Sequence, residues 1–273
     1  MDAVIAACRA ALTRSGTVIA LTGAGVSADS GVPTFRGKEG YWTVGSHAYQ
    51  PEDLATHEAF TKMPWDVWAW YLYRRGVCRA ASPNDGHYAL ARWDDAMKES
   101  ADRFALVTQN VDGLHRRAGS PAARTYAIHG DIDQMRCAQD CCLDRWPIPA
   151  GVPALAKGEA VDPAARALLV CPACGEMARP HVLWFDESYD EPRYSLDTVR
   201  DLASSAVLVV VAGSSGQTNL PWQVVTLAAR NGATIVDINP EANSFGDLAA
   251  HSGGVIRGSS ATNLPLLVDA LTR

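Results

Sequence analysis

Closely spaced glycines directly follow a short β-branched run at residues 17–21. The segment at 22–37 begins with Gly23 and Gly25 and continues through small hydroxyl residues. Glycines at the end of a strand let backbone N–H groups approach a pyrophosphate, so this spacing predicts a nucleotide-binding loop. The segment departs from the dinucleotide fingerprint G-x-G-x-x-G, because Ala28 stands where the third glycine would be.

The cysteines are a second group of residues whose side chains could do chemistry. Five of the seven cysteines lie close together in the sequence, as Cys137, Cys141, Cys142, Cys171 and Cys174. Two thiolate pairs joined by a long loop favour a tetrahedral structural zinc site with no open position for a reaction. The fourth ligand is Cys141 or Cys142, and we favour Cys141. The alternative is a set of reduced cysteines without metal.

Polar side chains also follow other apolar runs. His129 closes the run at 125–128, where an imidazole that titrates near neutrality can act as a general base; the alternative is a structural histidine. Gln109, Asn110 and Asp112 follow the run at 104–108, and their hydrogen-bonding groups suit a ribose or an amide, or else a solvated turn. We expect His115, one helical turn beyond Asp112, to be structural.

The elements that must position these residues alternate between helix and strand. Continuous apolar runs predict buried strands of a parallel sheet. They lie at 17–22, 104–108, 125–128, 206–212, 234–239 and 255–258. An amphipathic helix is expected at 2–14, a helical insertion without strands at 38–82 and a loop at 147–167. Because polar clusters follow the strands, they would gather at the sheet edge where open α/β folds bind ligands.

Composition excludes several classes of function. The chain has 273 residues, with 24 basic and 30 acidic side chains and a net charge of −6. No block of lysine and arginine is present, so neither nucleic acid nor a zinc-ribbon nucleic-acid binder fits well. The N-terminus has no basic leader and no apolar run is long enough to span a bilayer, so we expect a cytoplasmic protein with no membrane partner.

Several motifs together resemble those of sirtuins, which are NAD-dependent protein lysine deacylases. They are residues 23–37, 108–115, His129-Gly130, 179–182 and 237–241, with the cysteine pairs between them. The resemblance covers nearly the whole chain and implies an α/β fold, a Rossmann-like parallel-sheet domain with a smaller helical plus zinc-binding domain. The NAD-binding domain would comprise 1–37, 84–133 and 180–273, the helical module 38–83 and the zinc-binding module 134–179.

The resemblance implies that NAD is a co-substrate and that Zn²⁺ is structural, held by Cys137, Cys141, Cys171 and Cys174. Around the nicotinamide and its ribose it places Ala24, Phe35, Arg36, Gln109, Asn110 and Asp112, with Gly23 and Gly25 in the same loop. Gly213 and Ser214 would meet the phosphate side, Asn239 and Glu241 the adenosine ribose, and Ser260 the adenine.

In the mechanism that the resemblance implies, the catalytic residues are His129, Asn110 and Asp112. The acyl oxygen of a modified lysine attacks the nicotinamide ribose and nicotinamide leaves. His129 then deprotonates a ribose hydroxyl, which attacks the resulting imidate, and water completes the release of lysine and O-acyl-ADP-ribose. Such chemistry needs an enclosed site and a positioned base. The partners would be acylated-lysine proteins or peptides, and we expect a monomer.

The helical insertion resembles the sirtuin branch that removes negatively charged acyl groups, which predicts a desuccinylase or demalonylase. Ala55 would widen the acyl pocket, and Tyr71 and Arg74 would bind the distal carboxylate, for which a guanidinium fork is suited. The alternative is an aromatic helix whose arginines only pack and form salt bridges.

Two segments depart from the family pattern. Asp186 stands where sirtuins have glycine beside the substrate cleft, and residues 213–221 differ from the usual Gly-Thr-Ser segment. NAD hydrolysis or ADP-ribosyl transfer in the same pocket therefore remains an alternative. A catalytically silent NAD-sensing module is a further one, which the presence of His129 disfavours.

Overall fold

The computed structural model of the chain describes residues 1–33, 42–44, 47–97 and 103–273. Its larger part is built on a parallel sheet of six strands in the order β11-β10-β9-β1-β4-β5. The strands are β1 (Thr17–Thr22), β4 (Phe104–Thr108), β5 (Thr125–Ala127), β9 (Ala206–Ala212), β10 (Thr234–Asn239) and β11 (Gly254–Arg257). The expected α/β fold with a Rossmann-like sheet is therefore confirmed.

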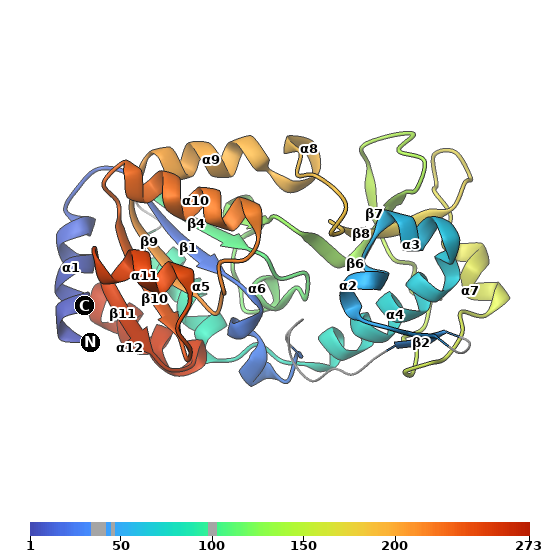
Figure 1. Cartoon of the computed structure of the whole chain (residues 1–273), viewed down its shortest axis with the longest axis horizontal. Coiled ribbons are helices and arrows are strands. Elements are labelled where there is room, and N and C mark those ends of the chain that lie inside the picture. Colours follow the sequence, from blue (N-terminus) through green and yellow to red (C-terminus); the bar gives the residue numbers. More distant parts are fainter. Residues whose placement is uncertain (34–41, 45–46, 98–102) are drawn as a thin grey trace.

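Helices cover both faces of this sheet (Figure 1). One face packs on α1 (Asp2–Leu12), α5 (Asp85–Ala96) and α12 (Ser260–Thr272), the other on α9 (Leu196–Ser204), α10 (Asn219–Arg230) and α11 (Ser244–Ala250). Side chains of one strand alternate between the faces: Val18 joins the first core and Ile19 the second. Since both faces are buried, the strands are apolar throughout, which is why they could be recognised in the sequence.

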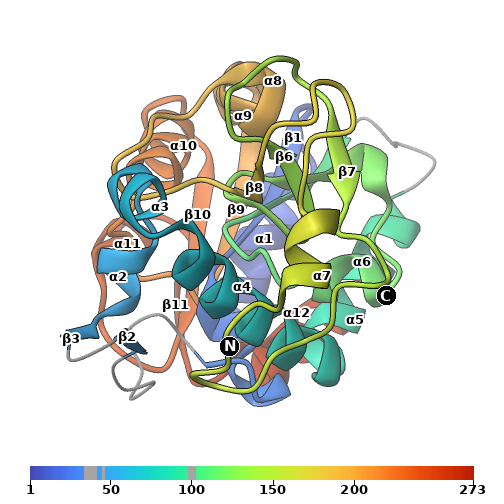
Figure 2. The ribbon, with the colours of Figure 1, turned by 90° about the vertical axis from the view of Figure 1, so that its right-hand side faces the viewer.

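A second group of elements forms the other end of the molecule (Figures 1 and 2). It contains the hairpin β2 (Trp42–Val44) and β3 (His47–Tyr49), and the helices α2 (Pro51–Leu54), α3 (His57–Lys62), α4 (Pro64–Ala80) and α7 (Pro163–Leu168). The antiparallel strands β6 (Gly130–Cys137), β7 (Arg145–Pro147) and β8 (Ala178–Val182) complete it. The helices and the antiparallel strands β6–β8 share one apolar core, in which Trp68 and Trp184 are buried.

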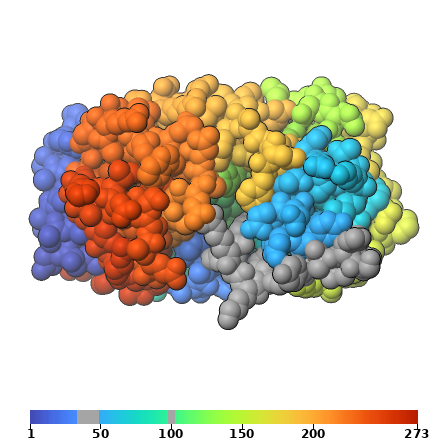
Figure 3. Space-filling model, viewed as in Figure 1, coloured from blue at the N-terminus to red at the C-terminus, as the bar shows by residue number. Residues whose placement is uncertain are grey.

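The described residues also form several short elements. They are the 3₁₀ turns η1 (Ala24–Val26), η2 (Ala28–Ser30) and η4 (Ala122–Arg124), and the short helices α6 (Leu114–Arg117) and α8 (Glu191–Tyr194). In the space-filling view α1, α11 and α12 lie at one end of the visible face and α2–α4 lie toward the other (Figure 3). In the part of the chain that is described, no helix is both long and apolar enough to cross a membrane.

Some expected elements differ from those observed. The first helix ends at Leu12, short of residue 14, and the strands at 17–22, 104–108, 206–212 and 234–239 are confirmed. The helical insertion was expected to lack strands, but β2 and β3 pair within it, and α7 lies within the expected loop at 147–167. Elements of three to six residues carry too little periodicity to be recognised without their packing partners.

Candidate active site

The sheet has a topological switch point between β1 and β9. The chain proceeds from β1 toward β4 and β5 on one side and from β9 toward β10 and β11 on the other. Loops that leave the carboxyl ends of neighbouring strands diverge at such a point and leave a crevice where open α/β folds bind ligands. The segments that follow β1, β4 and β9 carry most of the predicted site residues.

The two glycine segments pack directly on one another. Gly25 N–H donates to the carbonyl of Gly213 over 2.9 Å, and Gly23 N–H donates to that of Ala212 over 3.1 Å. A Cβ on Gly25 would lie 2.7 Å from Cα of Gly213, which itself has φ of +62°. The glycines therefore permit a close backbone approach between loops. Their N–H groups are occupied, whereas that of Ala24 has no hydrogen bond to the described residues and can serve a ligand.

Ser27 connects the first loop to the loop after β4. Its hydroxyl donates to Oδ2 of Asp112 over 2.7 Å and accepts from Nδ2 of Asn110 at 3.1 Å. Nδ1 of His87 accepts from the N–H of Asn84, so Nε2 carries the proton and donates to Ser27 at 3.3 Å. Every hydrogen-bonding position of Ser27 is thus filled, and the side chain is structural.

The loop after β9 is tied to Gln109. The amide nitrogen of Gln109 donates to Oγ of Ser214 over 2.7 Å, and its amide oxygen accepts from Oγ1 of Thr218 over 2.8 Å. Asn239 donates to the carbonyl of Ser214 at 3.3 Å and also to Asp237, which is fully buried. The predicted residues of β4, β9 and β10 are therefore joined in one hydrogen-bonded row.

The predicted adenosine end lies farther along this edge. The carbonyl of Glu241 accepts from Arg257 over 2.7 Å. Ser260 begins α12 beside the start of α5, where a Cβ on Gly86 would lie 3.0 Å from the Ser260 carbonyl. The Ser260 hydroxyl is buried without a hydrogen-bond partner among the described residues. An unpartnered buried hydroxyl is a group that a bound ligand can satisfy.

His129 lies just beyond the end of β5 and is half-buried. Burial lowers its pKa to about 4, so the ring is neutral at pH 7 and can accept a proton. Its Nε2 is 2.8 Å from the hydroxyl of Tyr189. His115 is buried, with Nε2 at 2.9 Å from Oγ1 of Thr22, and is placed as a structural residue. Phe35 and Arg36 lie outside the described residues.

The cysteines form a compact cluster. Cys137, Cys141, Cys171 and Cys174 have sulfur atoms that all lie within 4.8 Å of one another. The distances are 3.7 Å for Cys137–Cys174 and 3.6 Å for Cys141–Cys171. Tetrahedral zinc with bonds of about 2.3 Å holds its sulfurs about 3.8 Å apart, so the cluster fits that ion. Cys142 stands outside this tetrad.

The predicted acyl residues meet the segment that follows β8. Trp184 donates its indole N–H to the Tyr71 hydroxyl over 2.9 Å, and Phe185 N–H donates to the carbonyl of Ala55 over 2.9 Å. Arg74 lies on α4 one turn beyond Tyr71 and is also buried, with its guanidinium 5.2 Å from the Trp70 ring centroid. A charged and a phenolic donor therefore share one buried helix face.

Asp186 connects the segment after β8 to the start of α3. Its carboxylate accepts from the N–H of His57 over 2.7 Å and from that of Glu58 over 3.1 Å, at the start of α3. A carboxylate there satisfies N–H groups that lack partners in the helix. The side chain that departs from the sirtuin pattern thus has a structural role at α3.

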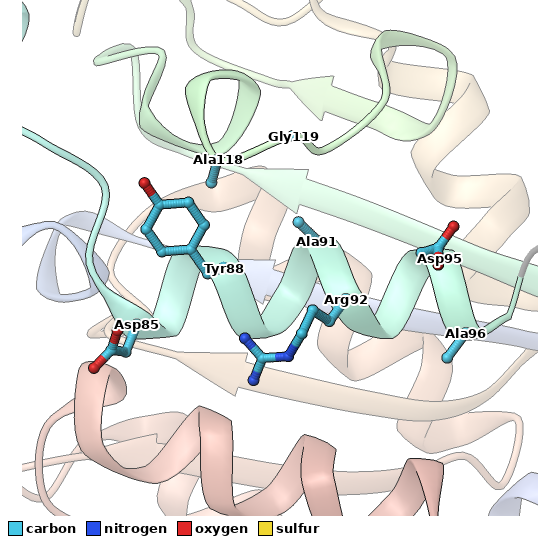
Figure 4. A pocket seen from close by; sticks show the side chains of 8 residues that line it. All are labelled: Asp85, Tyr88, Ala91, Arg92, Asp95, Ala96, Ala118 and Gly119. Carbon is cyan, nitrogen blue, oxygen red and sulfur yellow. The ribbon is translucent and has the colours of Figure 1, made fainter.

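Two surface hollows are not lined by His129. One, of about 810 Å³, lies on the outer side of α5, where Tyr88 and Ala91 point toward Ala118 and Gly119 (Figure 4). The other, of about 290 Å³, lies beside the start of α10 at Trp222. We place the site by the convergence of polar loops and not by these hollows, because ligands of open α/β sheets bind at the strand ends.

Several positioning residues could not be identified from the sequence. Asn84, at the start of α5, donates to the Val26 carbonyl at 2.8 Å and to Oγ of Ser30 at 2.9 Å, holding both 3₁₀ turns. His87 and Thr218 were missed as well. Their partners lie far away in the sequence, so no local pattern marks them; only the N-cap position of Asn84 before an apolar helix gave a signal.

Comparisons with known proteins agree on one family. Residues 23–219 match the profile of the Sir2 family. An NAD-dependent protein deacylase of Aquifex aeolicus is 38% identical over 224 residues, covering 82% of this chain and 83% of the relative. One from Methylococcus capsulatus is 37% identical over 266 residues, covering 97% and 96%. The crystal structure of a Sir2 homolog–NAD complex aligns with a TM-score of 0.77 at 32% identity, covering 97% of this chain and 92% of that one.

Proposed function

This chain belongs to the Sir2 family, and on that premise we propose that it is an NAD-dependent protein deacylase that transfers acyl groups from lysine to ADP-ribose. The observation that carries the proposal is the position of His129. It follows β5 (Thr125–Ala127) at the ligand edge of the sheet, neutral and close to the loops that Gln109 and Asn110 join. A neutral imidazole in that position is suited to accept a proton from a ribose hydroxyl.

The residues at this edge fit NAD. The N–H of Ala24 and the hydroxyl of Ser260 have no hydrogen-bond partner in the described part of the chain; the first would face the phosphate or ribose, and the second would meet the adenine. The amides of Gln109 and Asn110 are held between loops and would orient the nicotinamide ribose. When bound, NAD supplies an electrophilic ribose carbon with nicotinamide as leaving group. His129 then takes a proton from the ribose hydroxyl, and the surrounding loops exclude water.

Zn²⁺ would be structural. The tetrad of Cys137, Cys141, Cys171 and Cys174 offers four thiolates at the spacing that tetrahedral zinc requires. Four protein ligands leave no position for substrate, so the ion would stabilise the β6–β8 sheet and take no part in acyl transfer.

We propose in addition that acidic acyl groups such as succinyl and malonyl are favoured. The support is the shared burial of Tyr71 and Arg74 on one face of α4, beside the segment that holds Ala55. The Tyr71 oxygen accepts from Trp184, so its own O–H can donate to a carboxylate. The guanidinium of Arg74 is always charged and supplies the complementary charge.

The experiment combines the purified chain, NAD and peptides with acetyl-, malonyl- or succinyl-lysine, and identifies the products by mass. We expect nicotinamide, free lysine and O-acyl-ADP-ribose, with the acidic acyl groups processed faster. ADP-ribose alone, or ADP-ribose attached to protein, would instead establish NAD hydrolysis or ADP-ribosyl transfer. The His129→Ala variant should bind NAD in calorimetry but lose deacylation by at least about a hundredfold.

A further inference from the structure

A row of ion pairs runs from the zinc-binding loop, residues 137–141, to the segment that follows β8. Asp140 lies between the proposed ligands Cys137 and Cys141, and its carboxylate accepts from Nη1 of Arg136 near the end of β6. Nη2 of the same guanidinium is 3.4 Å from Oε1 of Glu187. Arg136 therefore joins a carboxylate of the zinc-binding loop to one that follows β8.

Glu187 in turn holds the backbone at Trp184. Its Oε2 accepts from the N–H of Trp184 over 2.9 Å and from Nη2 of Arg179 over 2.9 Å, while its Oε1 accepts from Nη1 of Arg179. The Arg179 guanidinium also lies over the indole of Trp184, at 3.2 Å from the ring centroid. The position of Trp184 thus depends on where the Glu187 carboxylate lies.

The segment at 184–185 contacts both parts of the predicted acyl pocket. The indole N–H of Trp184 donates to the Tyr71 hydroxyl, and the N–H of Phe185 donates to the Ala55 carbonyl, each over 2.9 Å. A displacement of this backbone would therefore move the groups that hold Tyr71 and Ala55.

The balance of charge explains what Asp140 contributes. The side chains of Arg136 and Arg179 are only 7% and 2% exposed, and both pair with Glu187. Asp140 supplies a second carboxylate to these two buried cations. It is half exposed itself, yet loss of its charge would leave Arg136 to compete with Arg179 for Glu187. A carboxylate drawn toward Arg136 would release the N–H of Trp184.

The backbone of Asp140 links this charge to the metal site. Its φ is +50°, in the left-handed region that few residues other than glycine adopt. Nη2 of Arg193, on α8, donates to the same carboxylate over 3.0 Å. An ion bound by Cys137 and Cys141 would fix the loop between them, and with it the carboxylate above Arg136.

We infer that Asp140 positions the segment at 184–185 through Arg136 and Glu187, so that zinc binding and binding of the acylated peptide favour each other. The inference rests on the proposed function, which includes the zinc ion and the acyl-lysine substrate. Asp140 is a positioning residue, because it acts on the acyl pocket through other side chains. Coupling between two sites is reciprocal, so the peptide should slow the loss of zinc.

The test compares Asp140→Asn with Asp144→Asn in the full zinc-loaded chain. Asparagine keeps the size of the side chain and tolerates the left-handed backbone, so the first variant removes only the charge. Asp144 is the control, an exposed carboxylate three residues beyond Cys141. The measurements are zinc content, amide hydrogen exchange at 183–187, kcat and KM for the acyl-lysine peptide that the parent processes fastest, and removal of zinc by a chelator. The last is followed with and without that peptide, in the absence of NAD.

We expect Asp140→Asn to retain one zinc per chain and to exchange the Trp184 amide about tenfold faster, because this N–H loses its acceptor. KM for the peptide should rise about 3- to 10-fold with kcat within about twofold, since the substituted residue does not touch the reacting atoms. The peptide should slow zinc removal at least about fivefold in the parent and have no effect in Asp140→Asn. Asp144→Asn should match the parent in every measurement.

Three results would overturn the inference. They are parent-like hydrogen exchange in a zinc-loaded Asp140→Asn, a peptide that slows zinc removal equally in this variant and the parent, and equal effects of Asp144→Asn. If Asp140→Asn does not hold zinc, Glu187→Gln decides, because it breaks the same row of contacts away from the metal. Retained coupling in Glu187→Gln would then refute the inference.

Failure of the proposed function has a different signature. A parent that processes no acyl-lysine peptide would refute the deacylase activity. Hydrogen exchange at 183–187 needs no turnover, so the comparison of Asp140→Asn with the parent would still decide whether Asp140 positions this segment.

Discussion

The hydroxyl of Ser27 donates a 2.7 Å hydrogen bond to Oδ2 of Asp112, and the same carboxylate accepts from the N–H of Leu114 through Oδ1. This buried carboxylate thus joins the loop after β1 to that after β4. In Asp112→Asn only one side-chain atom can accept, so one of the two donors would face an NH₂ group. We expect a loss of about 1–3 kcal/mol in unfolding free energy and a KM for NAD raised about tenfold.

Asp85→Asn is the control for this prediction, because Asp85 is an exposed carboxylate on α5. Denaturant unfolding and steady-state kinetics measure the two effects. If Asp112→Asn and Asp85→Asn have the same unfolding free energy and the same KM for NAD, Asp112 has no part in holding the loops.

The cysteine cluster predicts that neighbouring residues differ in metal binding. Cys141 belongs to the tetrad and Cys142 does not. Cys141→Ser should therefore lose zinc, lower the melting temperature and expose the β6–β8 sheet to proteolysis, since binding of a structural ion stabilises the fold. Cys142→Ser should keep one zinc per chain by elemental analysis. Retention of the ion by Cys141→Ser and its loss from Cys142→Ser would reverse the assignment.

The buried guanidinium of Arg74 predicts an acyl preference. Arg74→Met keeps an apolar stem of similar length but removes the charge, so kcat/KM for succinyl peptides should fall at least about tenfold while that for acetyl peptides holds or rises. Arg79→Met removes an exposed cation from the same helix and should leave kcat/KM unchanged for both the succinyl and the acetyl peptides. If the acyl ratio in Arg74→Met equals that of the parent, the guanidinium does not bind the acyl group.

The large sheet could be predicted because each strand is recognisable from its own residues. Residues 206–212 are buried on both faces, so the strand is apolar at each position and bounded by polar residues. The hairpin of β2 and β3 and helix α7 could not be predicted, because three to six residues fold there only against neighbours. Their stability comes from tertiary packing, which has no periodic signature in the sequence.

The site residues also include some that the sequence indicates and others that only the folded structure brings together. The glycines of the first loop were recognised, but the sequence did not indicate that Gly23 and Gly25 donate to Ala212 and Gly213 at the end of β9. Tyr189 and Asp186 could not be placed, since each acts on a partner more than fifty residues away. A sequence motif indicates which side chains gather, whereas the donor and acceptor of each bond follow only from the folded geometry.

The last prediction concerns stability in acid. His87 is buried between Asn84 and Ser27, and desolvation lowers its pKa to about 4, from about 6.5 in an unfolded chain. Between these pH values the unfolded chain binds the extra proton, so the contribution of His87 to stability is present above pH 6.5 and lost as the pH falls toward 4. The shift corresponds to at most about 3 kcal/mol.

Because Nδ1 of His87 accepts from Asn84, protonation in the folded state would also break that bond. Unfolding by urea at pH 7.5, 6.0 and 5.0 should therefore show decreasing stability, and His87→Gln, which cannot titrate, should flatten this dependence while lowering stability at pH 7.5. His251→Gln is the control at an exposed histidine and should follow the parent curve. A parent and a His87→Gln variant with parallel curves would mean that another group, such as His115 with its pKa also lowered by burial, governs the acid transition.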